Sequence, residues 1–282
     1  MKLQFFGTAA AEGIPGIFCN CPMCKEAREK KGKYIRTRSQ AMLDDTLLID
    51  FNADTYAHSL AYDINLADLE HVLITHVHED HYYPVEFFNR QEWFSHAMKN
   101  QPLTVHGSED LEVSARASWG ALKVDPHRLL DQKRIAFNIL KPFEPQEIAG
   151  YKVTPLPANH GTPHPYVYII QKGDKTMLYY NDSGYLSSEA MAFLKEKAFK
   201  FDLVSYDCTF GKRPSGGNGH MGVPENVEMR KRFMENGNYK DTTISIITHF
   251  SHNNPNVGYD DMLKIAKENG FELSYDGMIV EF

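Results

Sequence analysis

The residues with the clearest chemical potential lie in one short segment, T-H-V-H-E-D-H at residues 75–81. It follows an apolar run that we expect to form a buried strand. Imidazole nitrogens and carboxylate oxygens are common ligands of divalent metal ions. His76 and His78 can point to one side where the strand ends, whereas Asp80 and His81 face a second position from the turn that follows. The spacing therefore predicts a metal site with two positions.

Three further ligand-type residues each follow an apolar run, namely His160, Asp182 and His249. Taken alone, each would be an ordinary turn residue. Buried strands can deliver such residues to a shared edge of a sheet, where they would complete the set of ligands begun at residues 75–81. In that order along the chain, they predict a two-metal centre.

Three of the four cysteines are crowded into one segment, at Cys19, Cys21 and Cys24. A disulfide scaffold in a chain of this length would spread its cysteines, and in a cytosolic protein such a cluster more often binds metal. A closed structural zinc site takes four ligands, and three cysteines with one histidine are a standard set. Spacing alone does not choose between His220 and His252 as the fourth ligand.

The elements that must position these residues alternate between strands and helices. Expected strands are 2–6, 46–51, 71–75, 151–155, 165–171, 176–180, 202–206 and 243–248, and expected helices are 22–31, 83–97, 187–197, 224–235 and 259–268. This alternation indicates an α/β layered fold rather than an all-β sandwich. Two Gly-rich loops, 7–18 and 211–222, follow predicted strands, where binding groups are often mounted.

The composition is that of a globular protein: of 282 residues, 42% are hydrophobic and 24% are charged. These values exclude a disordered chain, a coiled coil and a collagen-like fibre. No apolar run approaches the roughly 18 residues of a membrane span, and the apolar patch after Met1 is too short for a secretory signal. We therefore expect a cytoplasmic protein. The net charge of −7 argues against bulk binding of nucleic acid but permits a small anionic substrate at a metal.

Nearly the whole chain resembles the metallo-β-lactamase superfamily and, within it, the PhnP-like phosphodiesterases of the carbon–phosphorus lyase pathway. The motifs that carry the resemblance are Phe6-Gly7-Thr8-Ala9, Cys19-x-Cys21-x-x-Cys24, Leu48-Ile49-Asp50, residues 75–81, Asn159-His160, Asn181-Asp182-Ser183, Tyr206-Asp207-Cys208, Thr248-His249-Phe250-Ser251-His252 and Tyr275-Asp276-Gly277-Met278. H-x-H-x-D-H is specific for the superfamily, and the cysteine motif with T-H-x-S-H is specific for the PhnP-like branch and a few relatives. The resemblance implies a single hydrolase domain over residues 1–282 with a four-layer αββα sandwich.

The resemblance also implies which residues bind metal. One divalent ion, zinc or manganese, would be held by His76, His78 and His160. A second would be held by Asp80, His81 and His249, and Asp182 would bridge the two. A structural zinc would be held by Cys19, Cys21, Cys24 and His252, so the resemblance selects His252 as the fourth ligand.

Catalytic roles are implied for two side chains, Asp80 as a ligand of the second metal and His220 in the second Gly-rich loop. His220 would protonate the leaving oxygen or contact the phosphate, and general acid catalysis contributes about 10²–10⁴-fold. Asp50 would brace the histidine segment, although the glycine that commonly follows it within two residues is absent.

The implied activity is the hydrolysis of small organic or cyclic phosphodiesters by a hydroxide that two metal ions activate. The expected partner is the small substrate, with a homodimer among the expected assemblies. Three alternatives stay open: a PqqB-like cofactor-biosynthesis protein, a tRNA-processing nuclease and a non-catalytic zinc-binding module. The full set of seven ligands disfavours the first, and the net charge of −7 disfavours the second. Absence of metal from the His/Asp set would favour the third, and β-lactam hydrolysis does not match a bridging Asp182.

Overall fold

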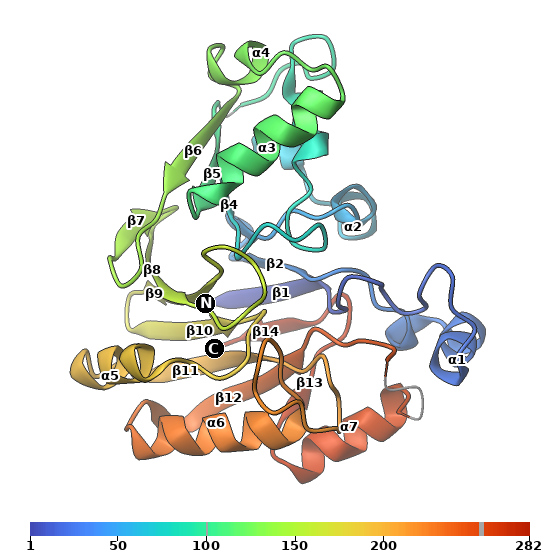
Figure 1. The fold of residues 1–282 in the computed structure, drawn as a ribbon, viewed down its shortest axis with the longest axis vertical. Helices are drawn as coiled ribbons and strands as arrows, with labels where there is room; N and C mark the ends of the chain where they lie inside the picture. Colours follow the sequence, from blue (N-terminus) through green and yellow to red (C-terminus); the bar gives the residue numbers. More distant parts are fainter. Residues whose placement is uncertain (100, 254–256) are drawn as a thin grey trace.

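The computed structural model describes residues 1–99, 101–253 and 257–282, and within these ranges two seven-stranded sheets face each other (Figure 1). The first sheet has the order β14 (Ile279–Glu281), β1 (Lys2–Gly7), β2 (Gln40–Leu43), β3 (Leu47–Ile49), β4 (His71–Leu73), β5 (Leu103–Gly107) and β6 (Ile135–Ile139). The second has the order β13 (Glu272–Leu273), β12 (Tyr239–Thr248), β11 (Phe201–Asp207), β10 (Lys175–Tyr180), β9 (Tyr166–Lys172), β8 (Tyr151–Pro157) and β7 (Gln146–Ile148).

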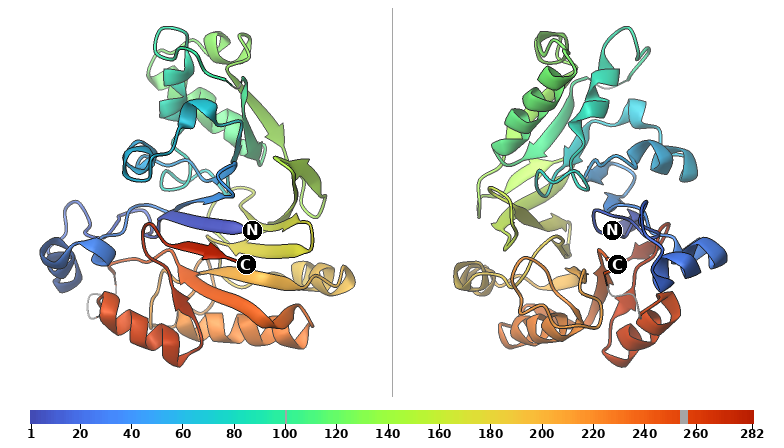
Figure 2. Two further views of the ribbon diagram at one scale, coloured as in Figure 1. Left: turned by 180° about the vertical axis from the view of Figure 1, so that it is seen from behind. Right: turned by 45° about the vertical axis from the view of Figure 1, so that its right-hand side comes forward.

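Helices cover the outer face of each sheet, as both views in Figure 2 show. The α-helices are α1 (Pro22–Lys30), α2 (Thr55–Ala61), α3 (Asp110–Ala121), α4 (His127–Leu130), α5 (Ser188–Glu196), α6 (Val223–Glu235) and α7 (Tyr259–Glu268), and the 3₁₀ helices are η1 (Gly32–Tyr34), η2 (Leu66–Asp68) and η3 (Pro84–Arg90). Trp119 of α3 packs in one buried cluster with Val72 and Val105 of the first sheet. Phe233 of α6 packs with Val204 of the second. These four layers confirm the predicted αββα sandwich.

The molecule has three apolar layers, one between the sheets and one under the helices on each side. The alternating directions of the side chains along each strand explain how the strands fill them. Successive side chains of a strand point to opposite faces of its sheet. In β3, Leu47 and Ile49 enter the core between the sheets, whereas Leu48 packs under the helices on the other face. In β10, Tyr179 lies in the core between the sheets and Tyr180 lies in the layer under α5 and α6. Strands of this kind are apolar on both faces because both faces are buried.

One predicted element is wrong in part. The helix expected at 83–97 is a 3₁₀ helix that ends at Arg90, and turns follow it. Phe87 is buried, whereas Trp93 is 71% and Phe94 55% exposed. The aromatic residues of this segment therefore do not line one buried face, as they would in an amphipathic helix.

The two ends of the chain meet at neighbouring strands. The amino group of Met1 donates to the carbonyl of Phe282 at 2.7 Å, and Figure 1 places the two ends side by side. Helix α1 meets the start of α7, where Lys30 Nζ lies 3.7 Å from Asp260 Oδ2, and the hydroxyl of Tyr34 in η1 donates to the same carboxylate. This contact brings the cysteine segment close to the residues that follow β12.

Candidate metal centre

The ligand-type residues lie where strands of both sheets end at one edge of the sandwich. β10, β11 and β12 are parallel neighbours, so their carboxyl ends meet at the same edge. Asp182 and His249 follow the first and last of these strands, and Asp207 ends the middle one. His160 follows β8, and residues 75–81 follow β4 of the first sheet. Each side chain is therefore carried by a buried strand.

Three histidines form the first ligand set. His78 Nδ1 lies 3.1 Å from His76 Nε2 and 2.9 Å from His160 Nε2. Nitrogen lone pairs that face each other at this distance repel unless a proton or a cation lies between them. The three side chains therefore have the arrangement of a metal-binding triad.

A second set lies beside the first and is fully buried. His81 Nε2 lies 3.1 Å from His249 Nε2. Asp80 Oδ2 lies 3.5 Å from His81 Nε2 and 3.6 Å from His249 Nε2. Two imidazoles and one carboxylate thus converge on a second position, as the spacing of residues 75–81 predicts.

Asp182 lies between the two sets. Its Oδ2 atom is 3.5 Å from His160 Nε2, which belongs to the first set. The same oxygen is 3.6 Å from His249 Nε2 and 3.9 Å from His81 Nε2, which belong to the second. One carboxylate oxygen is therefore within 4 Å of ligands on both sides, which is the position of a bridging ligand.

Four of the histidines are also held through the ring nitrogen that faces away from the centre. These contacts are His81 Nδ1 to Asp50 Oδ2 at 2.7 Å, His76 Nδ1 to Thr75 Oγ1 at 3.0 Å, His249 Nδ1 to Thr209 Oγ1 at 2.8 Å and His160 Nδ1 to the carbonyl of Gly219 at 3.1 Å. Such outer partners fix the ring orientation and the tautomer of a metal-binding histidine. The centre is therefore preorganised by the protein itself.

Asp50 braces the histidine segment, as expected from its place in the sequence. Its Oδ1 atom accepts from the backbone N–H and from the hydroxyl of Thr75, both at 2.9 Å, and its Oδ2 atom faces His81. Asp50 has a φ of 65° and His249 has a φ of 63°. Left-handed backbone costs non-glycine residues about 1–2 kcal/mol each, and it is often found at functional sites.

His220 lies at the rim of the centre. Its Nδ1 atom lies 2.6 Å from Asp182 Oδ1 and 3.2 Å from Asp207 Oδ2, and its side chain is 26% exposed. The ring stacks on His249 with a centroid distance of 5.9 Å. Because Nδ1 faces the carboxylates, Nε2 lies on the opposite side of the ring, away from them.

Two residues of the centre are missing from the sequence-based prediction. Asp207 is fully buried, and its Oδ2 atom lies 3.2 Å from His249 Nδ1 as well as from His220 Nδ1. The hydroxyl of Thr209 donates to the same oxygen at 2.9 Å. Asp207 ends an apolar strand, the same signal that identified Asp182 and His249. Thr209 carried no comparable signal.

The charges of the centre follow from its burial and its neighbours. Burial lowers the pKa of His76 well below its ordinary value and also lowers that of His78. Both rings are therefore neutral near pH 7, which is the form that binds metal. Burial opposes ionisation of Asp80, but His81 and His249 lower the pKa of this carboxyl far below its ordinary range.

The chemistry of these donors fits divalent ions. Within the described part of the chain, one ring nitrogen each of His76, His78 and His160 lies within 4.8 Å of the other two. The same holds for a carboxylate oxygen of Asp80 and one ring nitrogen each of His81 and His249. Imidazole with carboxylate suits zinc and also manganese. The residues that the sequence predicts as ligands are brought together in the two predicted sets.

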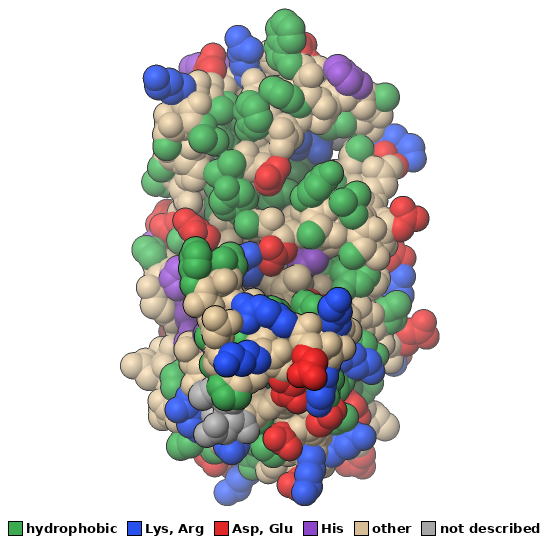
Figure 3. All heavy atoms as spheres, turned by 90° about the vertical axis from the view of Figure 1, so that its right-hand side faces the viewer, with side chains coloured by type: hydrophobic (Ala, Val, Ile, Leu, Met, Phe, Trp, Pro, Cys, Tyr) green, Lys and Arg blue, Asp and Glu red, His purple; other side chains and the backbone are tan. Residues whose placement is uncertain are grey.

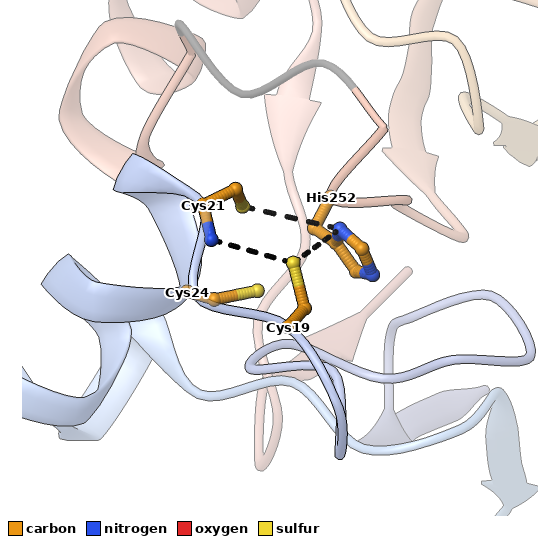
Figure 4. A group of neighbouring side chains, drawn as sticks. All are labelled: Cys19, Cys21, Cys24 and His252. Atoms are coloured by element: carbon orange, nitrogen blue, oxygen red, sulfur yellow. Dashed lines mark hydrogen bonds between the residues drawn. The ribbon is translucent and has the colours of Figure 1, made fainter.

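The cysteine cluster is a separate group on a loop (Figure 4). Cys19 Sγ lies 3.6 Å and Cys21 Sγ lies 3.9 Å from His252 Nδ1, and these atoms and Cys24 Sγ lie within 4.8 Å of one another. His220 lies in the other cluster. The structure therefore groups His252, and not His220, with the cysteines. Three sulfurs and one imidazole match the donor set of structural zinc.

Backbone contacts shape the cysteine loop. The N–H of Gly16 donates to Cys24 Sγ at 3.3 Å, and the N–H of Cys21 donates to Cys19 Sγ at 3.4 Å. A Cβ atom at position 16 would lie 2.7 Å from Nε2 of His252. A side chain at this position would therefore require the ring of His252 to shift.

A sandwich of this topology, with a cluster of histidines and aspartates at its strand ends, defines a hydrolase of the metallo-β-lactamase fold. The chain belongs to the β-lactamase superfamily, because residues 46–250 match the Beta-lactamase superfamily domain. No helix among residues 1–99, 101–253 and 257–282 is long and apolar enough to cross a membrane.

Solved structures resemble the chain over its whole length. A diphosphatase of the PhnP family is 19% identical, with a TM-score of 0.72, over 100% of this chain and 96% of that one. Zn²⁺-bound PqqB from Methylobacterium extorquens is 16% identical, with a TM-score of 0.77, over 100% of both chains. Identities this low establish the shared fold alone.

Among curated proteins, Ribonuclease Z of Staphylococcus epidermidis is 26% identical over 112 residues, which are 40% of this chain and 32% of that protein. The match therefore spans about a third of the length of this relative.

Proposed function

We propose that the chain is a metal-dependent phosphodiesterase that hydrolyses small organic or cyclic phosphodiesters. The observation that carries the proposal is the pair of ligand sets joined by Asp182, whose Oδ2 atom lies 3.5 Å from His160 and 3.6 Å from His249. Two ions held in this way would lower the pKa of a bound water to about 7 and orient the oxygens of a phosphate. That chemistry suits a stable phosphodiester, which needs a strong nucleophile and neutralisation of its charge.

The chain's own residues would hold the reacting groups in place. Asp182 fixes the separation of the two sets, and Asp50 fixes the orientation of His81. Asp207 holds the outer nitrogen of His249 at 3.2 Å. Burial of Asp182, His81 and His249 keeps bulk water away from these contacts, which strengthens them.

His220 is proposed as the general acid. Asp182 and Asp207 both face its Nδ1 atom, so the imidazolium form is stabilised there. Nε2 is turned away from these carboxylates and could give its proton to a leaving oxygen. Loss of such a proton donor costs about 10²–10⁴-fold when the leaving group is a strong base.

The cysteine cluster is proposed to hold one structural zinc. His252 lies three residues after His249, so this ion would tie the N-terminal loop to the segment that carries an active-site ligand. Zinc in a closed site with four protein ligands has no open position for a substrate.

RNA cleavage is a second candidate, favoured by the partial match to Ribonuclease Z. The charge distribution disfavours it. The net charge is −7, and on the face drawn in Figure 3 the Lys and Arg side chains are intermixed with Asp and Glu. RNA-binding surfaces instead concentrate Lys and Arg side chains in one positively charged patch.

The test is a panel of phosphodiesters assayed with defined metals. It includes a linear aryl diester, a 2′,3′-cyclic nucleotide, a ribose cyclic phosphate and a structured RNA, each with Zn²⁺ or Mn²⁺. Turnover of the small esters that depends on added metal supports the proposal. Cleavage of the RNA with no turnover of the small esters would favour the nuclease, and no turnover of either would exclude both.

A further inference from the structure

A series of polar side chains connects Asp276, which lies between β13 and β14, with the metal centre. The hydroxyl of Thr37 lies 2.7 Å from Asp276 Oδ2 and also 2.7 Å from His58 Nε2. His58 Nδ1 lies 2.6 Å from Gln40 Oε1. The amide nitrogen of Gln40 donates to the backbone carbonyl of Asp50 at 3.0 Å.

The orientation of the Gln40 amide determines which ring nitrogen of His58 carries a hydrogen. A backbone carbonyl can only accept, so the nitrogen of the Gln40 amide must face Asp50, and its oxygen must face His58. An amide oxygen cannot donate. Nδ1 of His58 therefore carries a hydrogen, and the neutral ring is the Nδ1–H tautomer.

The contacts among Thr37, His58 and Asp276 require one hydrogen more than a neutral histidine and an ionised aspartate supply. Thr37 has a single hydroxyl hydrogen but makes two contacts of 2.7 Å, and its third neighbour, the carbonyl of Phe6, is farther away at 3.4 Å. If the hydroxyl donates to His58, Asp276 must be protonated and donate to Thr37. If it donates to Asp276, His58 must be an imidazolium and donate to Thr37. Both forms contain the same extra proton.

We propose that Thr37, His58 and Asp276 form a relay that shares one proton. Through Gln40 and Asp50, this relay positions the metal ligand His81. The number of protons stays the same during the transfer. The carboxyl of Asp276 gives its hydrogen to Thr37, and Thr37 gives its own hydrogen to His58. The products are a carboxylate and an imidazolium.

The surroundings of the relay favour the proton on the carboxyl. Burial lowers the pKa of His58 to about 4 and raises that of Asp276 to about 6, so the relay holds its extra proton on the carboxyl below about pH 6. On the side of Asp276, the charged group is Arg36, which donates to Thr8, and Thr8 in turn donates to Asp276. On the side of His58, the charged group is Asp54, and this carboxylate pairs with Arg38 at 2.8 Å. Burial raises the pKa of Tyr62 to about 12, so its phenol stays neutral.

The relay acts on His81 through the backbone of Asp50. Asp50 has a φ of 65°, and the bond from Gln40 holds its carbonyl in this left-handed conformation. The same residue aims its carboxylate at His81 Nδ1 at 2.7 Å. His58 and Thr37 are thus positioning residues, and their effect on metal binding rests on the proposed metal centre.

The first test compares two substitutions of Thr37 in the full chain. Thr37→Val keeps the shape but removes the hydroxyl, whereas Thr37→Ser keeps the hydroxyl. Affinity for Zn²⁺ is measured by competition with a chelator. We expect the valine variant to bind zinc at the His/Asp centre about 10-fold or more weakly and the serine variant to match the wild type within about twofold. Wild-type zinc affinity in the valine variant would overturn the positioning role.

The second test observes the ring nitrogens of His58 by nitrogen-15 NMR, in protein with and without Zn²⁺. We expect a hydrogen on Nδ1 in both samples, held by Gln40, and a changed signal of Nε2 in the valine variant, because Thr37 contacts that nitrogen. A ring with hydrogen only on Nε2 would overturn the relay. This readout needs no catalysis: if the wild type bound no zinc at the His/Asp set, the proposed function would fail while the NMR result still decided the relay.

Discussion

The two candidate metal sites differ in what holds their ligands. The His/Asp centre takes its side chains from the ends of strands in both sheets, and His76, His81, Asp182 and His249 are each at most 2% exposed. The cysteine site takes three ligands from one loop and first turn of a helix, and Cys19, Cys21 and His252 are only partly buried. Sheet ends thus preorganise the first site, whereas the second rests on a loop that the proposed zinc would hold in shape.

This difference assigns different roles to the metals proposed for the two sites. Outer hydrogen bonds, such as that of Asp50 to His81, hold the first site in shape without an ion. The sulfurs of the second site accept bonds from the backbone N–H groups of Gly16 and Cys21, which are weaker restraints. Removing metal should therefore cost activity at the first site and stability at the second.

The largest effect is expected from Asp182→Ala. Loss of the carboxylate between the two sets should reduce phosphodiester turnover by about 10³-fold or more, since both the nucleophile and the charge stabilisation depend on the pair. The release of 4-nitrophenolate from an aryl diester measures it, with Asp174→Ala in an exposed turn as control. Near-normal turnover at saturating metal would mean that Asp182 does not bridge.

A smaller effect, which depends on the substrate, is expected from His220→Ala. An alkyl ester expels a strongly basic alkoxide that needs a proton, whereas an activated aryl ester expels a weakly basic phenolate. The alkyl substrate should therefore slow at least about 10²-fold more than the aryl one.

The measurement is kcat/KM for the two esters in the wild type and in the variant, with the exposed His96→Ala as control. Equal losses for both esters would make His220 a phosphate contact, and no loss for either would leave it without a role.

Cys24→Ser tests the second site. The variant should contain one zinc fewer per chain and melt about 5–10 °C lower, because binding energy of the folded state is lost. Turnover at low temperature should stay within a few-fold of the wild type. Elemental analysis and thermal melting measure both quantities, and Cys208→Ala should keep its full metal content. An unchanged Tm with unchanged zinc would remove the structural site.

The smallest effect concerns the support behind the first site. Burial holds the pKa of His58 at about 4, against 6.5 for an ordinary histidine. Between these values the unfolded chain binds a proton there that the folded chain does not. His58 therefore lowers the free energy of unfolding as the pH falls, by about 2 kcal/mol between pH 7 and pH 5.

In His58→Gln this loss should be absent. Urea unfolding at pH 7 and pH 5 measures the difference, and the exposed His96→Gln should behave as the wild type. The same pH dependence in His58→Gln as in the wild type would contradict the low pKa.

Much of the first site was predictable, because its ligands follow apolar strands in a short, specific spacing. The pairing of His252 with the cysteines was open from spacing alone, since the contacts of Cys19 and Cys21 with His252 depend on how the N-terminal loop packs against the segment after β12. Asp207 shared the strand-end signal and stood in one of the motifs of the resemblance, but no role was assigned to it. Strands β2 and β6 and helix α2 went unpredicted because segments of four to seven residues are too short to show a clear period. Helix α3 went unpredicted because its apolar residues alternate with other residues from Leu111 to Ala121, which is the pattern of a strand. The relay of Thr37, His58 and Asp276 joins three distant segments, which no local pattern reveals.

The most direct test of the central claim removes metal in steps and follows activity at each step. The zinc-loaded protein is treated with increasing chelator, and metal content and phosphodiester turnover are measured on the same samples. The account predicts three metal ions per chain at the start, a loss of turnover that parallels removal of the first two, and about one zinc that stays in the inactive but folded protein. Turnover that persists after only one zinc per chain is left would contradict it.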